Sequence, residues 1–527
     1  MIATTTQRRI TIAGFLCMMA FALIGVRLAD LTVLKGKLNA ANTNDVQAVV
    51  ARADIVDRNG QLLARDLPVD DFYIEPSAFH DKADAARKLA AASGIDADRI
   101  ARLMAGKSHH VLVARQLTPD VVARLNALKL PGLQFEAAMK RYYPMGIEAA
   151  QVIGSTDMDD NGVAGIEKGM DAQLRAPVGN QPVTLSLDMR VQYALAQEVE
   201  TARKRYKAKV AGGIVMDVNT GEILAMASLP NTGNGTGEQD PRRNHMAQDD
   251  YELGSVFKIF TFTLAMQDHT TRLDETFPIG AGFKLGRYTI HDAEHMPATL
   301  AARDILALSS NPGTAQIALR SGPDRQHAFL SSLGLLSPVH TEIAESRGPV
   351  APSHWGQIET ATIGFGHGIS VTPLAFATAA SAVVNGGRRV VPTFLKRDGD
   401  ARGEQLISLQ TSETMRALLR YVVTNGTGKL ADVPGYDIGG KTGSAEKNVH
   451  GRYVAHKLLT SFCAAFPIDK PRYLVFVMLD EPTGANAVGV MALAGHTAAP
   501  LAARVIARIA PILEVPANVL VQATGTP

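Results

Sequence analysis

The stretch that decides the fold is Tyr251–Met266, YELGSVFKIFTFTLAM, in which Ser255 and Lys258 stand three residues apart. The residues after Gly254 are apolar on nearly every face, which predicts a buried helix, and residues three apart share one face of a helix. Serine needs a base to act as a nucleophile, and desolvation lowers the pKa of a buried lysine. We therefore predict Ser255 as the nucleophile and Lys258 as its base.

The Ser-x-x-Lys string also has a plain interpretation. Short motifs of this kind arise often by chance, and a serine that follows a glycine can simply cap the start of a helix. The catalytic interpretation therefore depends on other elements of the chain.

A second polar segment follows a helix expected at 299–308, capped by its first residue. That helix ends at Ser309-Ser310-Asn311-Pro312. Proline biases the residue before it away from helical geometry, so Ser309 and Asn311 are expected to point the same way out of a non-helical turn. The alternative is an ordinary helix terminus, which serine and asparagine favour.

A third segment, Lys441-Thr442-Gly443-Ser444, lies in a glycine-rich run that is typical of a strand edge. Glycine in a strand lets another backbone, or a ligand, approach closely. The segment thus places one lysine and two hydroxyls where a ligand can bind. The alternative is an ordinary strand with bulges.

The elements around these segments alternate in type. Period-2 patterns and turn residues predict strands, and longer apolar runs predict helices. The strands are expected at 183–187, 212–217, 222–227, 438–444, 458–466 and 472–479, and the helices at 189–206, 372–384 and 497–512. Strands that flank central helices indicate an α+β or three-layer arrangement.

The composition bounds the class of protein. A chain of 527 residues with 46% hydrophobic and 20% charged residues is globular and long enough for two or three domains. The net charge of +2 gives no case for nucleic-acid binding. We find no phosphate-binding loop, dinucleotide fingerprint or zinc spacing, and so expect no cofactor and no metal. The two cysteines, Cys17 and Cys463, are not expected to form a disulfide.

The amino-terminal segment is apolar from Ile10 to Ala29, about the length needed to cross a bilayer. The interpretation as a membrane-spanning helix has two alternatives, a buried core helix and a signal peptide that is cleaved near 20–22. Apolar residues continue past that cleavage site, which favours an uncleaved anchor. Residues 1–9 are a short polar tail, and residues 30–50 are expected to form a polar stalk.

Residues 51–181 carry structural signals only. Asn59-Gly60 between alternating apolar residues predicts a β-hairpin, and 80–130 predicts two or three small amphipathic helices, one of which starts near Pro119. The region lacks a catalytic constellation and is interpreted as a scaffold or docking module.

A cluster of His291, Asp292, Glu294 and His295 offers groups that bind metals. Neither helical nor hairpin ligand spacing supports a metal site there. We therefore interpret the cluster as a solvated loop.

Three elements, Ser-x-x-Lys, Ser-x-Asn and Lys-Thr-Gly, occur in this order in penicillin-binding proteins and serine β-lactamases. Together with the apolar anchor, the chain resembles class B penicillin-binding proteins, and among them the peptidoglycan D,D-transpeptidases of the division septum. Further segments look like landmarks of that family along nearly the whole chain, namely Ile55–Gly60, Arg141–Pro144, Gly165–Glu167 and Gly368–Pro373.

The resemblance implies a fold and a domain order. The fold is α+β, with a transpeptidase domain of the serine β-lactamase type, in which helices surround a central antiparallel sheet, and with an elongated amino-terminal pedestal. The implied parts are a cytoplasmic tail (1–9), one transmembrane helix (10–29), a stalk (30–50), a pedestal or dimerisation-like domain (51–181), a transpeptidase domain (182–515) and a loose tail (516–527).

The resemblance also implies roles for the motif residues. Ser255 would attack the penultimate D-alanine of a stem peptide that ends in D-Ala-D-Ala, and Lys258 would accept its proton. Ser309 would relay a proton to the leaving amine, while Asn311 holds Lys258 and the substrate amide. Lys441 would place a positive charge near the terminal carboxylate.

By the same resemblance, the hydroxyls of Thr442 and Ser444, on either side of Gly443, would also bind the terminal carboxylate of the stem peptide. The oxyanion would lie between the backbone N–H groups of Ser255 and Ser444. The enzyme would sit in the inner membrane by a single pass, with its catalytic domain in the periplasm. β-Lactams would acylate it, and its partners would include a membrane glycosyltransferase and other division proteins.

Some residues depart from the family pattern, and rival functions remain. Leu253 stands where proline is common, and His367 is unusual in its loop. A D,D-carboxypeptidase or β-lactamase-like hydrolase is the nearest rival, but a class A β-lactamase needs a glutamate for deacylation, and no Glu-x-x-Asn occurs between Asn311 and Lys441. A non-catalytic division scaffold is disfavoured because all three motifs are present.

Overall fold

The computed structural model describes residues 51–106, 108–176, 181–231, 243–449, 452–483 and 492–518, together with Met18, Met19 and Ala22. No helix in these parts of the chain is long and apolar enough to cross a bilayer. The expected transmembrane helix at 10–29 lies outside them except for those three residues. The tail at 1–9, the stalk at 30–50 and the residues from 519 onward also lie outside.

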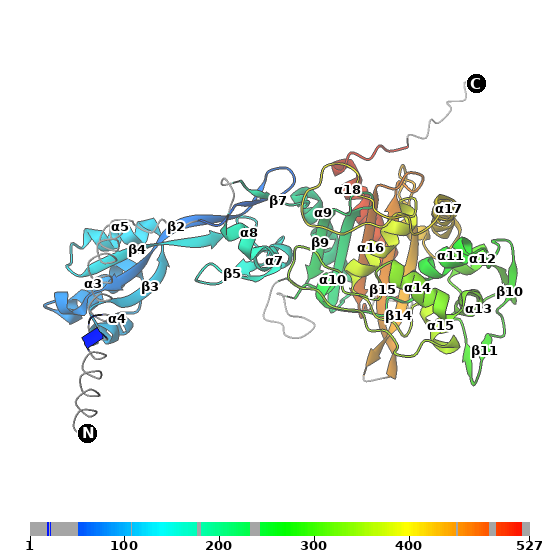
Figure 1. The fold of residues 1–527 in the computed structure, drawn as a ribbon, viewed down its shortest axis with the longest axis horizontal. Helices are drawn as coiled ribbons and strands as arrows, with labels where there is room; N and C mark the ends of the chain where they lie inside the picture. The colour runs from blue at the N-terminus through cyan, green and yellow to red at the C-terminus, as the bar shows by residue number, and fades with distance from the viewer. Residues whose placement is uncertain are drawn as a thin grey trace, which may run out of the picture.

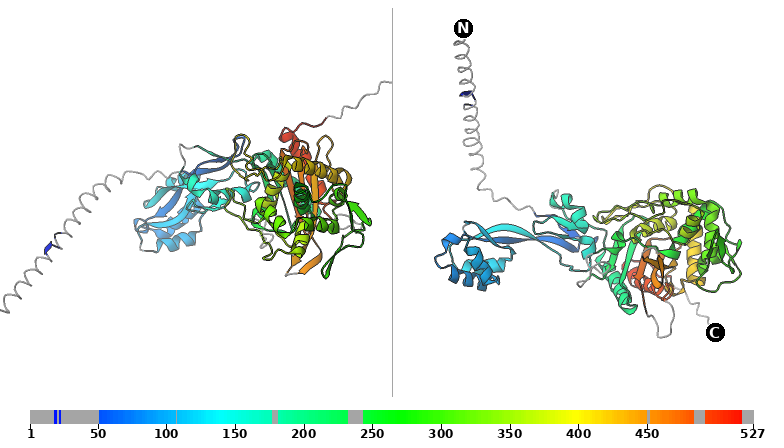
Figure 2. Two further views of the ribbon diagram at one scale, coloured as in Figure 1. Left: turned by 45° about the vertical axis from the view of Figure 1, so that its right-hand side comes forward. Right: turned by 90° about the horizontal axis from the view of Figure 1, so that it is seen from below.

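The molecule is elongated, with a small amino-terminal domain at one end and a larger domain at the other (Figure 1). In the small domain the long strand β2 (Leu62–Ile74) pairs with β4 (Leu133–Tyr142) along most of its length. Strand β3 (Val111–Leu117) pairs only with the distal half of β2, from Asp70 onward. The proximal halves of β2 and β4 therefore run as a two-stranded ribbon toward the larger domain (Figures 1 and 2).

Helices pack on the distal sheet because their apolar faces join one core. Phe72, Leu89, Ile100, Val113 and Leu125 are all fully buried there. The helices are α3 (Lys82–Ser93), α4 (Ala97–Met104) and α5 (Pro119–Ala127), preceded by the short turn η2 (Pro76–Ala78). The prediction of two or three helices is confirmed. Strand β3 was not predicted, because only one of its residues is buried and its apolar alternation is weak.

The predicted hairpin at Asn59-Gly60 is also confirmed. Strand β1 (Ile55–Val56) pairs antiparallel with the start of β2, with Ile55 opposite Ala64. The same strand pairs in parallel with β7 (Val183–Thr184). Strand β1 thus ties the start of the pedestal to the entrance of the larger domain.

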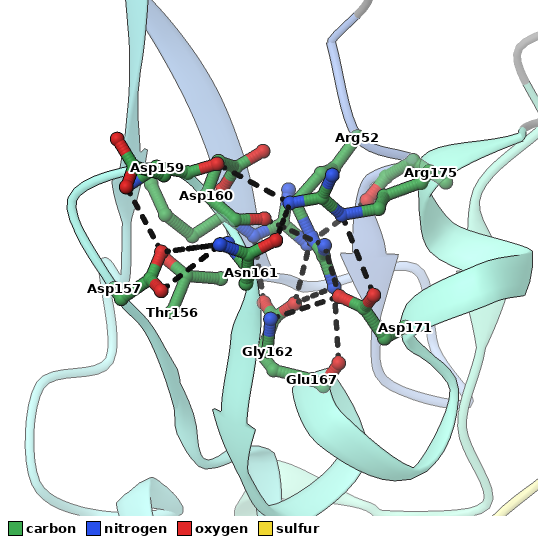
Figure 3. A network of polar contacts seen from close by, with 12 residues as sticks. Arg52, Thr156, Asp157, Asp159, Asp160, Asn161, Gly162, Glu167, Asp171 and Arg175 are labelled. Atoms are coloured by element: carbon green, nitrogen blue, oxygen red, sulfur yellow. Dashed lines mark hydrogen bonds and ion pairs between the residues drawn. The ribbon is translucent and has the colours of Figure 1, made fainter.

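Four buried charged residues hold the base of the pedestal together, and we call them the pedestal charge cluster: Arg52, Asp66, Arg141 and Glu167. Glu167 accepts from Arg141 Nε at 2.6 Å and from Arg52 Nη2 at 2.9 Å, while Asp66 accepts from Arg141 Nη1 at 3.1 Å. All four side chains are 0–1% exposed. Arg52 also donates to Asp171 and to the carbonyl of Asp160 (Figure 3).

The cluster joins parts of the chain that are distant in sequence, because Arg52 precedes β1, Asp66 lies on β2, Arg141 on β4 and Glu167 on α7 (Gly165–Gly169). The short elements around α7 are α6 (Ala150–Ile153), β5 (Ser155–Thr156), β6 (Gly162–Ala164) and α8 (Asp171–Arg175). Two of the family landmarks, Arg141 and Glu167, meet in this cluster. Paired, hydrogen-bonded charges of this kind are the form in which ions are tolerated in a core.

The larger domain is built on a five-stranded antiparallel sheet with the order β14-β15-β16-β8-β9. Side chains on β16 alternate between two hydrophobic cores, with Phe476 in one and Val477 in the other, so both faces of the sheet are covered. The strands are β8 (Val210–Asp217), β9 (Ile223–Leu229), β14 (Gly439–Val449), β15 (Arg452–Phe466) and β16 (Tyr473–Asp480).

Two helices, α9 (Met189–Arg205) and α18 (Ala498–Ile512), cover one face (Figure 1). The other face is covered by α11 (Lys258–Gln267), α16 (Pro373–Val384) and α17 (Leu409–Asn425). The three-layer α+β prediction is therefore confirmed, and the predicted helices at 189–206, 372–384 and 497–512 appear within one residue of their expected bounds.

Smaller elements complete this domain. They are α10 (His245–Gln248), η5 (Gly254–Phe257), β10 (Thr276–Pro278), β11 (Phe283–Leu285), β12 (Tyr288–Ile290), β13 (Thr299–Ala301), α12 (Ala302–Leu308), α13 (Asn311–Ser321), α14 (Pro323–Ser332), α15 (Gln357–Gly364) and η6 (Lys429–Ala431). The prediction of a helix from residue 299 is wrong at its start. Residues 299–301 pair with β10 instead, and the helix begins at Ala302 without a side-chain cap.

Candidate active site

The candidate nucleophile lies on a turn that is pressed against the edge strand of the sheet. Ser255 belongs to the 3-10 turn η5, and the backbone N–H of Lys258 donates to its carbonyl as α11 begins. Strand β14 passes so close that a Cβ on Gly443 would lie 2.6 Å from the carbonyl oxygen of Leu253. Only glycine allows this approach, which agrees with the expected close contact at a glycine-rich strand edge.

Helix α11 is buried, as its apolar sequence predicts, and Lys258 is buried with it at 0% exposure. Its amine donates to the carbonyl of Ser309 and to Asn311 Oδ1 at 2.8 Å, and Ser309 Oγ lies 3.2 Å away. Burial lowers the pKa of Lys258 well below its ordinary value, the ammonium of Lys441 lowers it further, and the carboxylate of Asp292 raises it. The amine is therefore a candidate base near neutral pH.

The Ser-x-Asn segment forms the junction between two helices. Ser309 ends α12 with a left-handed backbone at φ 66°, and Ser310 caps α13 by accepting from the N–H of Gly313. The expectation that Asn311 is non-helical is wrong, because Asn311 is the first residue of α13 and Pro312 follows within its first turn. Proline is favourable there, since those N–H groups need no partner within the helix. The break that turns both side chains toward Lys258 falls at Ser309 instead.

The third segment brings a second lysine to the same place. Lys441 on β14 is 0% exposed, and its amine donates to Ser309 Oγ at 2.9 Å and to the carbonyl of Thr442 at 3.1 Å. Burial lowers the pKa of Lys441 to about 7. The hydroxyl of Ser309 thus lies between the amines of Lys258 and Lys441.

The two predicted hydroxyls of this segment have partners of their own. Thr442 Oγ1 lies 2.7 Å from Thr427 Oγ1. Ser444 Oγ accepts from the backbone N–H of Ala494 at 3.0 Å, and Ser444 lines the open cleft. The cleft has a volume of about 540 Å³ and also reaches Asn311.

Several residues of the cleft were not predicted to be site residues from the sequence. His367 lies edge-on to the ring of Tyr453, at 5.4 Å between centroids, and Tyr453 donates to Glu252 at 3.0 Å. Burial and the nearby Lys258 lower the pKa of His367 to about 4, so its ring is neutral at pH 7. Only its unusual place in the glycine-rich loop drew attention to His367 in the sequence.

That loop also touches the nucleophile turn. Gly366 has φ 86°, and a Cβ there would lie 2.0 Å from the carbonyl oxygen of Gly254. The N–H of Gly254 in turn donates to the carbonyl of Gly366. The loop and the turn therefore meet directly through their backbones.

The interpretation of residues 291–295 as a solvated loop is wrong for one member. Asp292 is half-buried, lines the cleft and accepts from Ser310 Oγ at 2.7 Å and from the N–H of Asn311 at 2.6 Å. Its neighbours His291, Glu294 and His295 are exposed. In the described part of the chain, no group of three or more metal-binding side chains comes together.

The fold and this arrangement define a class of protein. An antiparallel sheet between two helical layers, with Ser-x-x-Lys, Ser-x-Asn and Lys-Thr-Gly beside its edge strand, is typical of the penicillin-recognising serine enzymes. Within that class, residues 211–507 match the penicillin binding protein transpeptidase domain, and residues 47–200 match the penicillin-binding protein dimerisation domain. The chain belongs to the penicillin-binding protein family of transpeptidases.

Named relatives agree with this assignment. The chain is 40% identical to the probable peptidoglycan D,D-transpeptidase FtsI of Caulobacter vibrioides, over 88% of this chain and 82% of that protein. It is 29% identical to the peptidoglycan D,D-transpeptidase FtsI of Escherichia coli, over 87% and 84%. It is also similar in structure to penicillin binding protein 3 of Mycobacterium tuberculosis complexed with aztreonam. The TM-score is 0.68 at 26% identity, over 89% of this chain and 97% of that one.

Proposed function

We propose that this protein is a peptidoglycan D,D-transpeptidase that cross-links stem peptides through an acyl-enzyme on Ser255. The observation that carries the proposal is the environment of Lys258, a fully buried amine three residues after the serine. Its charged form is disfavoured, and Ser309 and Asn311 hold it by hydrogen bonds. A neutral amine in that position can accept the proton of the serine hydroxyl.

Acylation proceeds by attack of Ser255 Oγ on the carbonyl carbon of the penultimate D-alanine, while the hydroxyl proton passes to Lys258. The C–N bond to the last D-alanine then breaks, and the leaving amine takes a proton. Ser309 Oγ lies between both lysines and is within hydrogen-bond distance of Lys258, so it can relay that proton.

Charge stabilisation comes from the strand and the turn. Lys441, when protonated, attracts the terminal carboxylate of the substrate. Thr442, Gly443 and Ser444 follow it on strand β14. The backbone N–H groups of Ser255 and Ser444 would hold the oxyanion of the tetrahedral intermediate. One such donor is worth about 2.7–4 kcal/mol of transition-state stabilisation.

The acyl-enzyme is consumed when the amine of a second stem peptide attacks the same carbonyl carbon. A new C–N bond forms, the bond to Ser255 Oγ breaks, and the amine proton returns to the serine through Lys258. A β-lactam would acylate Ser255 in the same way, and its reaction would stop at the acyl-enzyme.

Labelling with a fluorescent penicillin tests the proposal. The wild-type protein should become covalently labelled, and Ser255→Ala should not be labelled while keeping the same melting temperature. Absence of wild-type labelling would refute the proposal. With a stem-peptide substrate, a cross-linked dimer indicates the transpeptidase, whereas a trimmed monomer alone indicates a D,D-carboxypeptidase.

We further propose that the protein works at the division septum, anchored by a single pass in the inner membrane, with its catalytic domain in the periplasm. Similarity to two proteins named FtsI supports the septal role. The apolar run at 10–29 supports the anchor. The expected partners are a membrane glycosyltransferase and other division proteins. Depletion followed by microscopy tests this role, because filaments indicate division and rounded cells would indicate elongation.

A further inference from the structure

One carboxylate outside the three motifs is bound to the turn that carries the second of them. Asp292 lies in the segment between β12 and β13, and its two oxygens have different partners. Oδ1 accepts from the backbone N–H of Asn311 at 2.6 Å, and Oδ2 accepts from Ser310 Oγ at 2.7 Å. A single side chain thus fixes two consecutive residues at the start of α13.

This anchoring acts on the base through Asn311. The Asn311 side chain accepts from the amine of Lys258 at 2.8 Å, and its backbone position depends on the bond to Asp292. Negative charge at a helix N-terminus is also favourable, because the N–H groups there carry partial positive charge. The carboxylate therefore holds the amide of Asn311 in the place where it meets the lysine.

The carboxylate also changes the electrostatics around Lys258. Three titratable groups face this amine from different elements: Lys441 on β14, His367 after α15, and Asp292. Lys441 lowers the pKa of Lys258, and the carboxylate of Asp292 raises it. The His367 ring, with a pKa of about 4, is neutral at pH 7 and adds no charge there.

We propose that Asp292 is a positioning residue of the acyl-transfer site, which holds Asn311 against Lys258 and places one negative charge beside the two lysines. The proposal rests on the function proposed above, because it assigns Asp292 a part in the same proton transfer. A helix cap alone would stabilise α13 but would not govern the ionisation of the lysine.

The test measures acylation by benzylpenicillin as a function of pH in the full-length protein, separating the acylation rate constant from the dissociation constant of the non-covalent complex. In Asp292→Asn the rate constant should fall by roughly ten- to a hundredfold, by analogy with the loss of residues that orient metal ligands. The dissociation constant should stay unchanged. The acid limb of the rate profile should move to lower pH by about one unit, because a favourable charge near Lys258 is lost.

Three further variants separate charge from capping. Ser310→Ala removes a hydrogen bond and the cap but keeps the carboxylate, so the rate should fall without a shift of the acid limb. Asp292→Glu keeps the charge and should leave the limb in place, which preserves the test if Asp292→Asn does not fold. Asp96→Asn is the matched control, since Asp96 caps α4 in the distant pedestal, and its profile should equal that of the wild type.

The outcomes distinguish two failures. If the wild-type protein is not acylated at all, the proposed function itself fails. If the wild type is acylated and Asp292→Asn has the same rate constant, or has a lower one with an acid limb that stays in place or rises, Asp292 is a structural cap only and the positioning role is overturned.

Discussion

The pedestal and the active site both bury cations, but they treat them in opposite ways. In the pedestal charge cluster, Arg52 and Arg141 are each bound to carboxylates of Asp66, Glu167 or Asp171 at 2.6–3.1 Å. In the active site, Lys258 and Lys441 are equally buried, yet neither makes an ion pair with a carboxylate in the described residues.

The difference shows how a fold assigns buried charge to stability or to chemistry. A buried cation that is hydrogen-bonded to carboxylates stays charged and fixes the geometry around it. A buried amine whose direct hydrogen-bond partners are neutral oxygens loses its proton more readily, because these partners compensate desolvation less than a bound carboxylate does. Burial is therefore common to both regions, and the presence of a carboxylate partner decides the outcome.

The largest expected effect comes from removing the unpaired amine. Lys258→Ala should lower the rate constant for acylation by penicillin by roughly 10²–10⁴-fold, the usual contribution of a general base, and the protein should stay folded. Stopped-flow labelling measures the rate constant, and circular dichroism measures folding.

Lys447 offers the matched control for that prediction. It lies on the same strand as Lys441, but its amine is paired with Asp480 at 2.8 Å. Lys447→Ala should therefore keep acylation within a few-fold of the wild type, but it should lower stability because the buried Asp480 loses this partner. Near-normal labelling of Lys258→Ala would remove this lysine as the base and break the contrast between the two regions.

In the pedestal we expect a substitution to lower the stability of the protein and to leave acylation unchanged. Glu167→Gln leaves two buried guanidinium groups short of a partner, and breaking a buried pair in this way costs about 3–5 kcal/mol. Two measurements, urea unfolding and hydrogen exchange in β2 and β4, should show this loss of stability, while the acylation rate constant should not change.

The exposed Asp159 provides the comparison for this variant. Its ion pair with Arg115 is at the surface, with Asp159 70% exposed, so Asp159→Asn should change stability by no more than about 1 kcal/mol. A Glu167→Gln protein as stable as Asp159→Asn would show that the buried cluster is not what holds the pedestal.

A smaller effect is expected from the charge of Lys441, which should make penicillin binding depend on pH. Burial lowers the pKa of Lys441 to about 7, so in the free enzyme its amine loses its charge as the pH rises through that value. The dissociation constant for benzylpenicillin, which carries a carboxylate, should therefore rise between pH 7 and 9 by an amount on the order of tenfold. The methyl ester of the same penicillin lacks the charge and should show a flat profile. Equal pH dependence for both ligands would contradict the role of Lys441.

The smallest effect concerns an imperfectly paired carboxyl beside the cluster. Burial, followed by the charge of Asp66, raises the pKa of Asp160 to about 6. A raised carboxyl pKa means that the folded state holds the proton more tightly, so the stabilisation is present at acid pH and is lost as the pH rises through about 6. Asp160→Asn should therefore be more stable than the wild type above pH 6, by on the order of 1 kcal/mol because the group is half-exposed. Melting temperatures should converge near pH 4, and a gap that persists there would contradict the assignment.

Much of the larger domain could be predicted from local sequence. The apolar run after Ser255 specifies a buried helix, and strands such as Tyr473–Asp480 are apolar on both faces because helices cover both. The order of the motifs then predicted which distant segments would meet. In the structure Lys258 binds Ser309 and Asn311, and Lys441 binds Ser309.

What could not be predicted depends on contacts between residues far apart in the chain. Asp292 looked like part of a solvated loop because nothing near it in sequence shows that it contacts Asn311, 19 positions later. The pairing of Arg52 with Glu167 spans 115 positions. Asn311 was placed outside a helix because the effect of proline on the preceding residue was weighed above its suitability for the first turn of α13.

The backbone contact between Gly366 and Gly254 has a consequence for drug resistance. Any side chain at position 366 would collide with the turn of the nucleophile, so a substitution there that keeps out a β-lactam would also displace Ser255. We therefore expect substitutions that alter β-lactam access at a neighbouring position whose side chain borders the cleft, such as His367. Two adjoining positions in one loop thus differ in the substitutions they can accept, because a side chain at 366 meets the backbone of Gly254 and the side chain at 367 borders the open cleft.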